Sequence, residues 1–379
     1  MTRSIIFLMD LVQDVNTLRP LMALARRDTA AELCVLVSAN FQKFDSTGLW
    51  IAELREACGI LGIPVYSYSS EFEAFQVLQE RSGLLISGSE SDARAHAGSH
   101  ALFQAAPAKF VRVTLQHGFE CLGFLHNAAH DRSHGLGAAF NADIICGWFG
   151  ENLLRSVKSG ERSKLIVTGP PLLIDTASIY APPAPTETPD GAVINGVEPH
   201  VEAERDPQTK PACLICENLH SVRLGNAVLR SDFISQFSDF AAAAAQSGLE
   251  VWLRPHPAGR YTDVKGIALP GGVQKSNGPI YKEDLRRFTF AISAPSSILF
   301  DCIVAGIPVA VWQDAEGEVD CRNYPGLPVV TSVEEWLEFA ALAEADRAGL
   351  LTAQRRFVDG LMLPEDIEAR YRDLLRSLG

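Results

Sequence analysis

The amino-acid sequence predicts an α/β protein built from two doubly wound domains that face a central cleft. Two series of short apolar strands alternate with helices, one before residue 176 and one after residue 210. Such alternation is typical of a mainly parallel sheet that helices cover on both faces. The stretch between the two series is rich in proline and polar residues, and 379 residues are more than one core usually fills.

The first series opens with the apolar segment SIIFLMD and runs to IVTGPPLLID. Apolar residues recur at helical spacing in the segments between its strands. We expect strands at 4–10, 32–39, 64–68, 84–89, 110–118, 142–150 and 164–175, and helices at 17–27, 48–62, 71–83, 93–106 and near 151–160. These elements predict a first domain over residues 1–175.

The second series predicts a domain over residues 211–330. We expect strands at 212–217, 249–255, 273–276, 290–294 and 308–313, and helices at 226–248, 280–288 and 296–306. Residues 176–210 read as a proline-rich linker with partial disorder, or as an ordered surface excursion. Residues 331–379 read as helical throughout.

Composition excludes several classes of function. A formal net charge of −13 argues against nucleic acid as a partner, because phosphate backbones need a basic stripe. The apolar run at the N-terminus is too short to span a membrane, and no later stretch approaches 18 apolar residues. The sequence therefore predicts a cytoplasmic protein and leaves peripheral membrane association open. Cys213 and Cys216 form a CxxC inside a strand, where they point to opposite faces and read as core thiols.

The segment AISAPSSILFDCIVAGIPVAVW carries the first candidate site. Pro295 opens a turn after a strand, and Ser296 and Ser297 begin the helix that Gly306 ends. Free backbone N–H groups and two hydroxyls at such a start suit a phosphate, and Asp301 one turn further suits a ribose diol. An ordinary serine cap with a solvated aspartate fits the pattern equally well.

The segment WLRPHPAGR carries the second candidate site, because two prolines fix a histidine where a strand ends. Ligands of open α/β sheets bind at the carboxyl ends of strands. His256 and Ser296 would then approach one ligand, and the imidazole would neutralise charge on a departing nucleotide. Arg254 and Arg260 read either as assisting groups or as surface charges.

These motifs together resemble a known family. RPHP (254–257), followed by APSSILFD (294–301) and AGIP (305–308), resembles the nucleotide-binding half of GT-B glycosyltransferases. It is most similar to bacterial enzymes that use CMP-activated acidic sugars, the sialyltransferases and Kdo transferases, and teichoic-acid CDP-glycerol glycerophosphotransferases share part of the pattern. The likeness covers residues 211–313 and extends more weakly to VTLQHGF (113–119) and IVTGPPLLID (166–175).

The resemblance implies two Rossmann-like domains, with C-terminal helices that brace the first. His256 and Pro257 would match the family's His-Pro motif, and Ser296 and Ser297 its Ser-Ser motif, at the phosphate of cytidine monophosphate. Asp301 would hold the ribose, and Arg254 lies in the same motif. The acidic motif that carries the base in several sialyltransferases is missing, and QHG (116–118) stands in its place.

The catalytic base is therefore an open choice among residues at strand ends. His117 precedes a glycine that permits close approach of a ligand, and it reads as a general base or as a histidine satisfied by backbone. Glu120 is near enough in sequence to share the cleft. Glu217, in CENLHSVRLG, would be the nucleophile if the reaction retains configuration, with Arg223 for an anionic group. Asn218 and His220 read as helix caps.

Two further segments are candidates for the side of the cleft that receives the acceptor. GFLHNAAHDRSHG spaces His126, His130 and His134 four residues apart, as a metal site on a helix would, but its glycines favour a mobile loop. No Asp-x-Asp pair is present, so we expect no metal and no cofactor. In DLVQDVNTLRPLMAL, the residues Asp10, Gln13 and Asn16 are candidate acceptor contacts, with capping by Asn16 or Thr17 as the alternative.

The resemblance implies a metal-independent glycosyltransferase that moves Kdo or a related nonulosonate from a CMP-activated donor. The acceptor would be a saccharide or lipid-linked saccharide of a bacterial surface polysaccharide or glycolipid, and the protein would associate peripherally with the inner membrane or with an assembly complex. Alternatives are a CDP-glycerol polyol-phosphate transferase, a non-catalytic nucleotide- or sugar-binding protein of such a complex, and a UDP-sugar epimerase. The sequence predicts no nucleic-acid partner.

Overall fold

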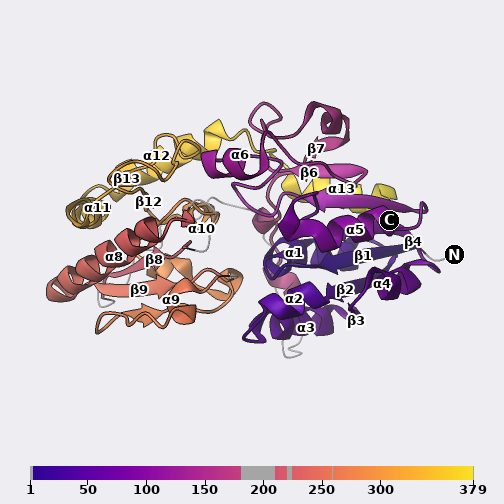
Figure 1. Ribbon diagram of the computed structural model, residues 1–379, viewed down its shortest axis with the longest axis horizontal. Coiled ribbons are helices and arrows are strands. Elements are labelled where there is room, and N and C mark those ends of the chain that lie inside the picture. The colour runs from indigo at the N-terminus through magenta and orange to yellow at the C-terminus, as the bar shows by residue number, and fades with distance from the viewer. Residues whose placement is uncertain (1–2, 181–209, 220–223, 258, 379) are drawn as a thin grey trace, which may run out of the picture.

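Two parallel sheets, each covered by helices, form the two halves of the molecule (Figure 1). This computed structural model describes residues 3–180, 210–219, 224–257 and 259–378. Most of the predicted linker, residues 181–209, lies outside the described residues, as do Arg223 and His220. The predicted class, two Rossmann-like α/β domains in the GT-B arrangement, is confirmed.

The first sheet has seven parallel strands in the order β3-β2-β1-β4-β5-β6-β7. Chain order reverses between β1 and β4, which makes that position the switch point where α/β sheets bind ligands. Successive side chains of β1 enter two separate cores, Ile6 and Leu8 on one face and Ile5 and Phe7 on the other. The strands are β1 (Arg3–Met9), β2 (Glu32–Ser38), β3 (Val65–Tyr68), β4 (Ser82–Ser87), β5 (Phe110–Leu115), β6 (Ile144–Gly147) and β7 (Leu165–Val167).

Helices cover both faces of this sheet, and several begin at a side chain that caps them. Ser70 is the N-cap of α4 and accepts from Glu73 N, while the Glu73 carboxylate accepts from Ser69 N, the residue before the cap. The helices of this half are α1 (Asp14–Asp28), α2 (Ala39–Phe44), α3 (Leu49–Leu61), α4 (Glu71–Leu78), α5 (Ala97–Ala105), α6 (Ala128–His134) and α7 (Ala177–Tyr180).

The second sheet has six parallel strands in the order β10-β9-β8-β11-β12-β13, with its switch point between β8 and β11. The strands are β8 (Ala212–Cys216), β9 (Glu250–Arg254), β10 (Gln274–Lys275), β11 (Phe290–Ser293), β12 (Val309–Trp312) and β13 (Val329–Val330). Its helices are α8 (Ala227–Ser247), α9 (Tyr261–Val264), α10 (Ile298–Val304) and α11 (Val333–Ala345). The core between this sheet and α8 centres on Phe233, Trp312 and Trp336.

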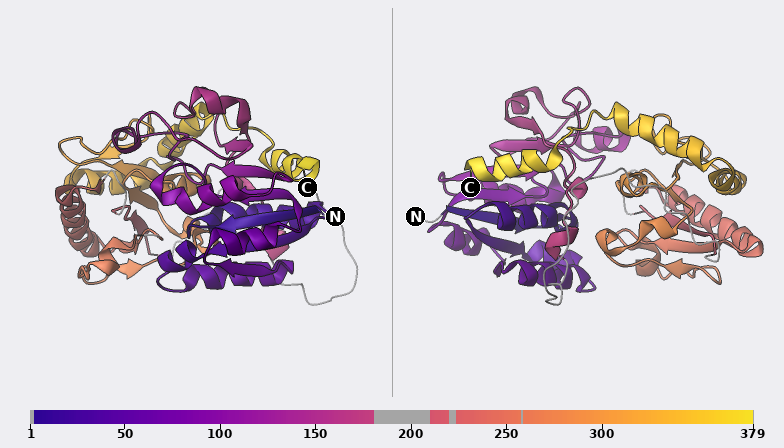
Figure 2. Two further views of the ribbon diagram at one scale, coloured as in Figure 1. Left: turned by 45° about the vertical axis from the view of Figure 1, so that its right-hand side comes forward. Right: turned by 180° about the vertical axis from the view of Figure 1, so that it is seen from behind.

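The last helices return to the first half of the molecule (Figure 2). After α11, the chain continues as α12 (Arg347–Gly360) and α13 (Ile367–Leu378). Tyr371 and Leu375 of α13 are fully buried in the core that α1 and β1 share. The Tyr371 hydroxyl donates to Gly169 O at 2.9 Å, so the C-terminal helix is fixed to the end of the first sheet.

Aromatic packing joins the two halves. Phe119, which follows β5, lies 5.1 Å from Tyr324, 5.7 Å from Phe357 and 6.3 Å from Phe300 between ring centroids. Phe119 is 1% exposed, and the core to which it belongs contains side chains of both sheets. The loop after β5 is therefore fixed against α10 of the other half.

Four predicted elements differ from the structure. The strand expected at 164–175 ends at Val167, and Pro171–Leu173 form a 3₁₀ turn. Residues 151–158 form turns in place of a helix, because Ser156 N donates to Phe124 O and Val157 bridges Ala138. Residues 280–288 form two 3₁₀ turns, where Tyr281 and Lys282 contact Glu53 of the first half. Residues 128–134 form the helix α6 in place of the predicted loop, because the Asn127 side chain accepts from His130 N as an N-cap.

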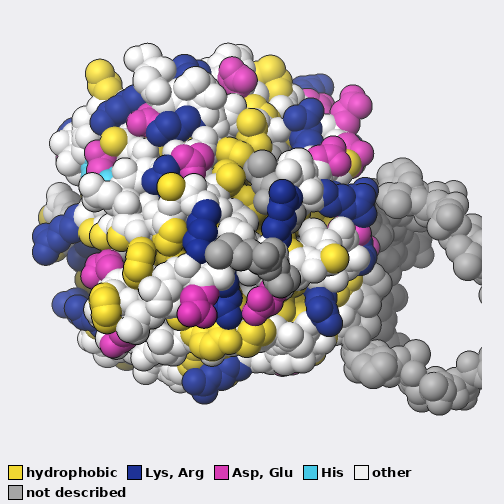
Figure 3. All heavy atoms as spheres, turned by 90° about the vertical axis from the view of Figure 1, so that its right-hand side faces the viewer, with side chains coloured by type: hydrophobic (Ala, Val, Ile, Leu, Met, Phe, Trp, Pro, Cys, Tyr) yellow, Lys and Arg dark blue, Asp and Glu magenta, His cyan; other side chains and the backbone are white. Residues whose placement is uncertain are grey.

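The distribution of charged side chains on the surface and the burial of two cysteines agree with the expectations drawn from the sequence. On the face of the first half shown in Figure 3, basic and acidic side chains are interspersed, and no uniformly basic surface is seen there. Among the described residues, no helix is both long and apolar enough to cross a membrane. Cys213 and Cys216 are free and buried in the cores on opposite sides of the second sheet, and burial raises the pKa of Cys216 to about 12. These two thiols are structural.

Candidate active site

A cleft of about 730 Å³ lies between the two halves. Its walls come from the carboxyl ends of β1, β4, β5 and β6 on one side and of β8, β9 and β11 on the other. Both switch points open into it, so the cleft is where the fold favours a ligand. Nearly all the residues selected from the sequence line it: Gln13, Asn16, His117, Glu120, Glu217, Asn218, Arg254, His256, Pro257, Ser296, Ser297 and Asp301.

His256 lies on a tight turn after β9. Its carbonyl accepts from Gly259 N at 3.1 Å and from Arg260 N at 2.9 Å, and Arg260 adopts a positive φ of 41°. The Arg260 guanidinium pairs with Asp263 at 2.7 Å and does not line the cleft. This turn fixes the backbone of His256 at the cleft wall, while the partly buried Arg260 is held in its ion pair with Asp263.

The two serines after β11 have different surroundings. Ser297 does not cap α10; its hydroxyl accepts from Phe119 N of the first half at 2.8 Å. The Ser296 hydroxyl has no partner among the described residues, although its side chain lines the cleft. Asn218 holds this turn in place, since its amide donates to Pro295 O at 2.8 Å. Ser296 therefore offers a hydroxyl to a ligand, and Ser297 connects the halves.

Asp301 and Arg254 lie beneath these serines. Burial raises the pKa of Asp301 to about 7, and the positive charge of Arg254 opposes that shift. Arg254 is 6% exposed and donates to Ser276 Oγ at 3.0 Å and to Gly278 O at 2.8 Å. Arg254 is thus held by its own half of the molecule, and its charge acts on the cleft from a fixed position.

Glu217 is 2% exposed, and its carboxylate oxygens accept from Thr262 N at 3.2 and 3.4 Å. Burial raises its pKa, and the Thr262 hydrogen bonds oppose that shift. Glu217 N in turn donates to Arg254 O at 3.0 Å. The carboxylate lies at the edge of the cleft and fixes the far end of the His256 turn, which is a positioning role.

The loop after β5 brings the first half to the serines. Gln116 folds this loop, since its amide donates to the carbonyls of Gly118 at 2.9 Å and Phe119 at 3.1 Å. A Cβ atom on Gly118 would lie 2.7 Å from Ser297 Oγ, so any larger residue requires the serine side chain to move. His117 Nδ1 lies 3.3 Å from Cys121 Sγ, and burial lowers the pKa of His117 to about 4.

Glu120 is held from both halves. Asn127 of its own loop donates to one carboxylate oxygen at 3.1 Å, and Asn323 of the second half donates to the other at 2.8 Å. Asn323 is 6% exposed and also donates to His126 O at 3.1 Å. The two amides leave the Glu120 carboxylate little rotational freedom at the cleft wall.

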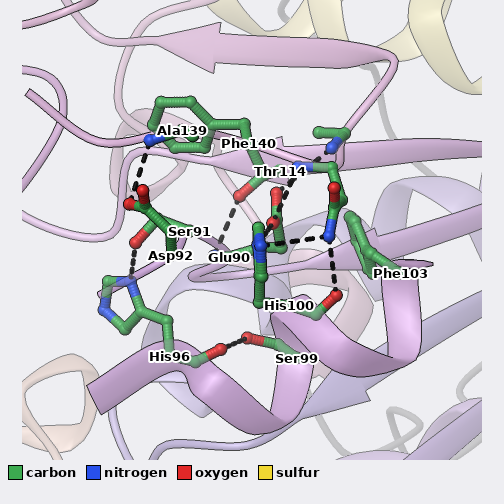
Figure 4. Close-up of polar contacts among 12 residues, drawn as sticks. Glu90, Ser91, Asp92, His96, Ser99, His100, Phe103, Thr114, Ala139 and Phe140 are labelled. Atoms are coloured by element: carbon green, nitrogen blue, oxygen red, sulfur yellow. Dashed lines mark hydrogen bonds and ion pairs between the residues drawn. The ribbon is translucent and has the colours of Figure 1, made fainter. Parts of the chain in front are cut away.

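The loop after β4 adds His96, a cleft residue not selected from the sequence (Figure 4). Ser91 Oγ hydrogen-bonds with His96 Nδ1 at 2.6 Å, and the His96 ring lies edge-on to that of His117 at 5.4 Å. Behind it, the buried Glu90 pairs with His100 Nδ1 at 2.5 Å and accepts from Asn141 N at 3.0 Å. This network fixes the loop that presents His96.

The acceptor-side candidates separate into two groups. Asp10 accepts from Ser38 Oγ at 2.6 Å and Asp14 from Leu11 N at 2.7 Å, and both carboxylates are buried beneath the cleft floor. Asp10 is therefore a structural residue and not a cleft residue. Gln13 and Asn16 line the cleft, as does Arg19, whose guanidinium carbon lies 3.5 Å from the ring centroid of Tyr180 and 4.3 Å from that of Tyr281.

The three spaced histidines do not form a metal site. His126 Nε2 accepts from Gly123 N at 2.7 Å, and its Nδ1 pairs with Asp131 at 3.1 Å. His130 and His134 lie on α6 and line the cleft. Within the described part of the chain, no group of three or more His, Cys, Asp or Glu side chains has the geometry to hold a metal ion.

Comparison with known proteins identifies the fold. No protein-family model matches the chain, and no curated protein matches it. A putative UDP-N-acetylglucosamine 2-epimerase from Listeria monocytogenes is similar over 99% of this chain and 95% of its own, with 11% identity and a TM-score of 0.60. UDP-GlcNAc 2-epimerase from Neisseria meningitidis, bound to UDP-GlcNAc, is similar over 100% and 99%, with 12% identity and a TM-score of 0.55.

A glycosyltransferase from Rickettsia africae is similar over 100% of this chain and 98% of its own, with 11% identity and a TM-score of 0.50. At such identities the likeness establishes the shared fold of glycosyltransferases and UDP-sugar epimerases and nothing finer. The CMP-sugar type of the sequence resemblance has no counterpart among these structures.

Proposed function

We propose that this protein is a glycosyltransferase that moves an acidic sugar, Kdo or a related nonulosonate, from a CMP-activated donor to a saccharide or lipid-linked acceptor. The observation that carries the proposal is the convergence of His256, Ser296 and Asp301 on one cleft with His117 and Glu120 of the other half. His256 and Ser296 match the His-Pro and Ser-Ser motifs and Asp301 the ribose position of the resemblance, and the last two lie across the cleft at the ends of the first sheet.

In the proposed reaction, the bond between the anomeric carbon and the CMP phosphate oxygen breaks, and the carbon bonds to an acceptor oxygen. His256 and the free Ser296 hydroxyl stabilise the charge that collects on the departing phosphate. The helix α10 has only seven residues, so these side chains, and not its dipole, are the main donors. Asp301 would accept hydrogen bonds from the ribose.

We assign the proton transfer to Glu120, which would take the proton of the acceptor hydroxyl as the new bond forms. Its carboxylate is already oriented by two amides, whereas both oxygens of Glu217 accept from Thr262 N–H. His117 contacts Cys121, and burial holds its pKa at about 4, so it is the weaker candidate.

The donor class is tested by thermal unfolding of the full chain in the presence of nucleotides. CMP at about 100 times its Kd should stabilise the protein by about 2.7 kcal/mol, because a ligand that binds the native state alone shifts the unfolding equilibrium. UMP, UDP and GDP serve as controls at equal concentration. A larger response to UDP than to CMP would contradict the donor assignment and favour the UDP-sugar chemistry of the neighbours with the same fold.

A donor screen separates the two chemistries that release CMP. CMP-Kdo and CMP-sialic acid should be hydrolysed slowly in the absence of acceptor, and CDP-glycerol should not be. Turnover of CDP-glycerol alone would indicate polyol-phosphate transfer at the same phosphate site. Binding of CMP with no turnover of any of the three donors, with or without glycan acceptors, would indicate a binding protein.

Asn323 supplies a test of the base. Replacing Asn323 with alanine should lower kcat about tenfold, because a buried hydrogen bond to a charged group is lost and Glu120 is free to rotate. The thermal shift that CMP produces should stay unchanged, since Asn323 lies outside the nucleotide motifs. Glu120→Gln, which keeps the size of the side chain, should lose more activity than Asn323→Ala; equal activity of Glu120→Gln and wild type would exclude Glu120 as the base.

A further inference from the structure

Five of the seven histidines that the structure describes line the cleft, and four of them come from the first half. We call these four, His96, His117, His130 and His134, the imidazole wall. His96 follows β4, His117 follows β5, and the other two lie on α6. The sequence indicated His117 by itself and His130 and His134 together with His126, and it did not indicate His96. The fold brings these four histidines to one side of one cleft.

The imidazole wall differs from the other histidines nearby in its partners. His100 pairs with Glu90 and His126 with Asp131, and neither lines the cleft. Within the described residues, no carboxylate lies at ion-pair distance from a histidine of the imidazole wall. The two histidines that pair with a carboxylate thus lie behind the imidazole wall. The four that face the cleft have no carboxylate partner among the described residues.

Polar groups without a partner among the described residues lie in and beside the imidazole wall. Trp148, which follows β6 and lines the cleft, is 3% exposed, and its indole N–H has no hydrogen-bond acceptor among the described residues. His130 Nδ1 is likewise buried without a partner there. Buried polar atoms are nearly always hydrogen-bonded in native proteins, so these two atoms beside the cleft are available to a ligand or to water.

Electrostatics agree with this geometry. Burial lowers the pKa of His96 to about 3 and that of His130 to about 4, and repulsion among the neighbouring histidines adds to the effect. An anion would favour the charged imidazoles and raise these pKa values, so its binding should take up protons. The other ionisable groups around the wall are Glu120 and Cys121 after β5, Asp131 with its partner Arg322, and Arg19 on α1.

We propose that the imidazole wall is an acceptor subsite for an oxyanion, so that the acceptor carries a phosphate or a carboxylate group. The proposal rests on the proposed function, in which the first half receives the acceptor. Neutral imidazoles and the Trp148 indole would each donate one N–H to the anion, and protonated imidazoles would add charge. The apolar side chains Leu122, Leu172 and Ile174 beside the wall leave room for a lipid-linked portion.

The probe is sulfate, because it stays a dianion throughout the pH range of interest. In titrations followed by histidine ring NMR signals, sulfate should bind about tenfold more tightly near pH 5.5 than near pH 7.5, since binding takes up protons. The double variant His96→Gln/His117→Gln should weaken sulfate binding about tenfold. His100→Gln, which keeps a donor to Glu90 behind the wall, is the matched control and should bind sulfate like the wild type.

The donor site provides the second control. His256→Ala should leave sulfate binding at the imidazole wall unchanged. If His256→Ala abolishes sulfate binding while the double variant retains it, the anion occupies the donor site and the proposal is wrong, although a CMP response would still support the proposed function. Conversely, sulfate binding at the imidazole wall with no thermal response to CMP would support the anion subsite and contradict the CMP-activated donor. Glycerol 3-phosphate and glucuronate, compared at equal concentration, then distinguish a phosphate from a carboxylate on the acceptor.

Discussion

Replacing His256 with alanine should lower kcat for sugar transfer by about 10²–10³-fold, which corresponds to about 3 kcal/mol of lost transition-state stabilisation. The imidazole lies on a turn that Pro255, Pro257 and two hydrogen bonds to its own carbonyl hold in place. A donor that is already oriented costs no reorganisation when charge develops on the phosphate. The effect should therefore appear in kcat, with a smaller change in KM for the donor.

The matched control for this variant is Arg260→Ala. Arg260 belongs to the same turn but pairs with Asp263 outside the cleft, so its loss tests damage to the turn itself. We expect kcat of Arg260→Ala to stay within a few-fold of wild type. A His256→Ala enzyme that keeps its activity within a few-fold would remove the central assignment, whatever the fold. Equal losses in both variants would instead show that the turn, and not the imidazole, matters.

The layout of the fold could be read from the sequence because parallel strands buried on both faces are continuous apolar runs. All four of β1, β2, β8 and β12 contain such runs, and Pro211 and Pro308 directly precede β8 and β12. The predictions failed where tertiary contacts replace local ones. Residues 151–158 donate to a neighbouring loop, and residues 280–288 contact α3 of the other half.

The residues of the candidate site also fall into two groups, those that a local sequence motif indicates and those whose role depends on tertiary contacts. Strand-end motifs such as RPHP and QHG indicated His256 and His117, because a parallel sheet places all its carboxyl ends at one edge. The roles of Glu217 and Ser297 could not be read, since each depends on a backbone N–H distant in sequence, that of Thr262 or of Phe119. Arg223, the candidate partner for an anionic sugar group, lies outside the described residues.

Asn323 and His96 were missed for a further reason. Asn323 is in a loop between β12 and β13 and reaches Glu120 only because the two halves face each other. His96 falls within an expected helix and is the last residue of the 3₁₀ turn Arg94–His96 that leads into α5, where its ring faces His117. An asparagine in a polar loop carries no local signal of its partner, and a histidine before a helix is equally uninformative. The roles of Asn323 and His96 can be assigned only from contacts with segments distant in sequence.

The junction of the halves positions the proposed catalytic groups, and Gly118 lies close against Ser297 there. Replacing Gly118 with alanine should lower kcat/KM by about 10–100-fold, because the new Cβ atom would lie 2.7 Å from Ser297 Oγ. The serine must then rotate and leave the buried Phe119 N–H without its acceptor, a loss of about 1–3 kcal/mol. His117 and Glu120, on the same loop, would shift away from the donor phosphate.

A double-mutant cycle with Ser297→Ala tests this mechanism. Ser297→Ala removes the Oγ atom, and the remaining Cβ lies at an ordinary 3.9 Å from the place that a methyl group at residue 118 would take. In the Ser297→Ala background, Gly118→Ala should therefore cost little more, so the two losses in kcat/KM are strongly non-additive. Additive losses would show that alanine at 118 obstructs the ligand directly and does not act through the serine. In that case Gly118 would be a substrate contact, and the close fit of the two halves would not be what sets the position of the loop.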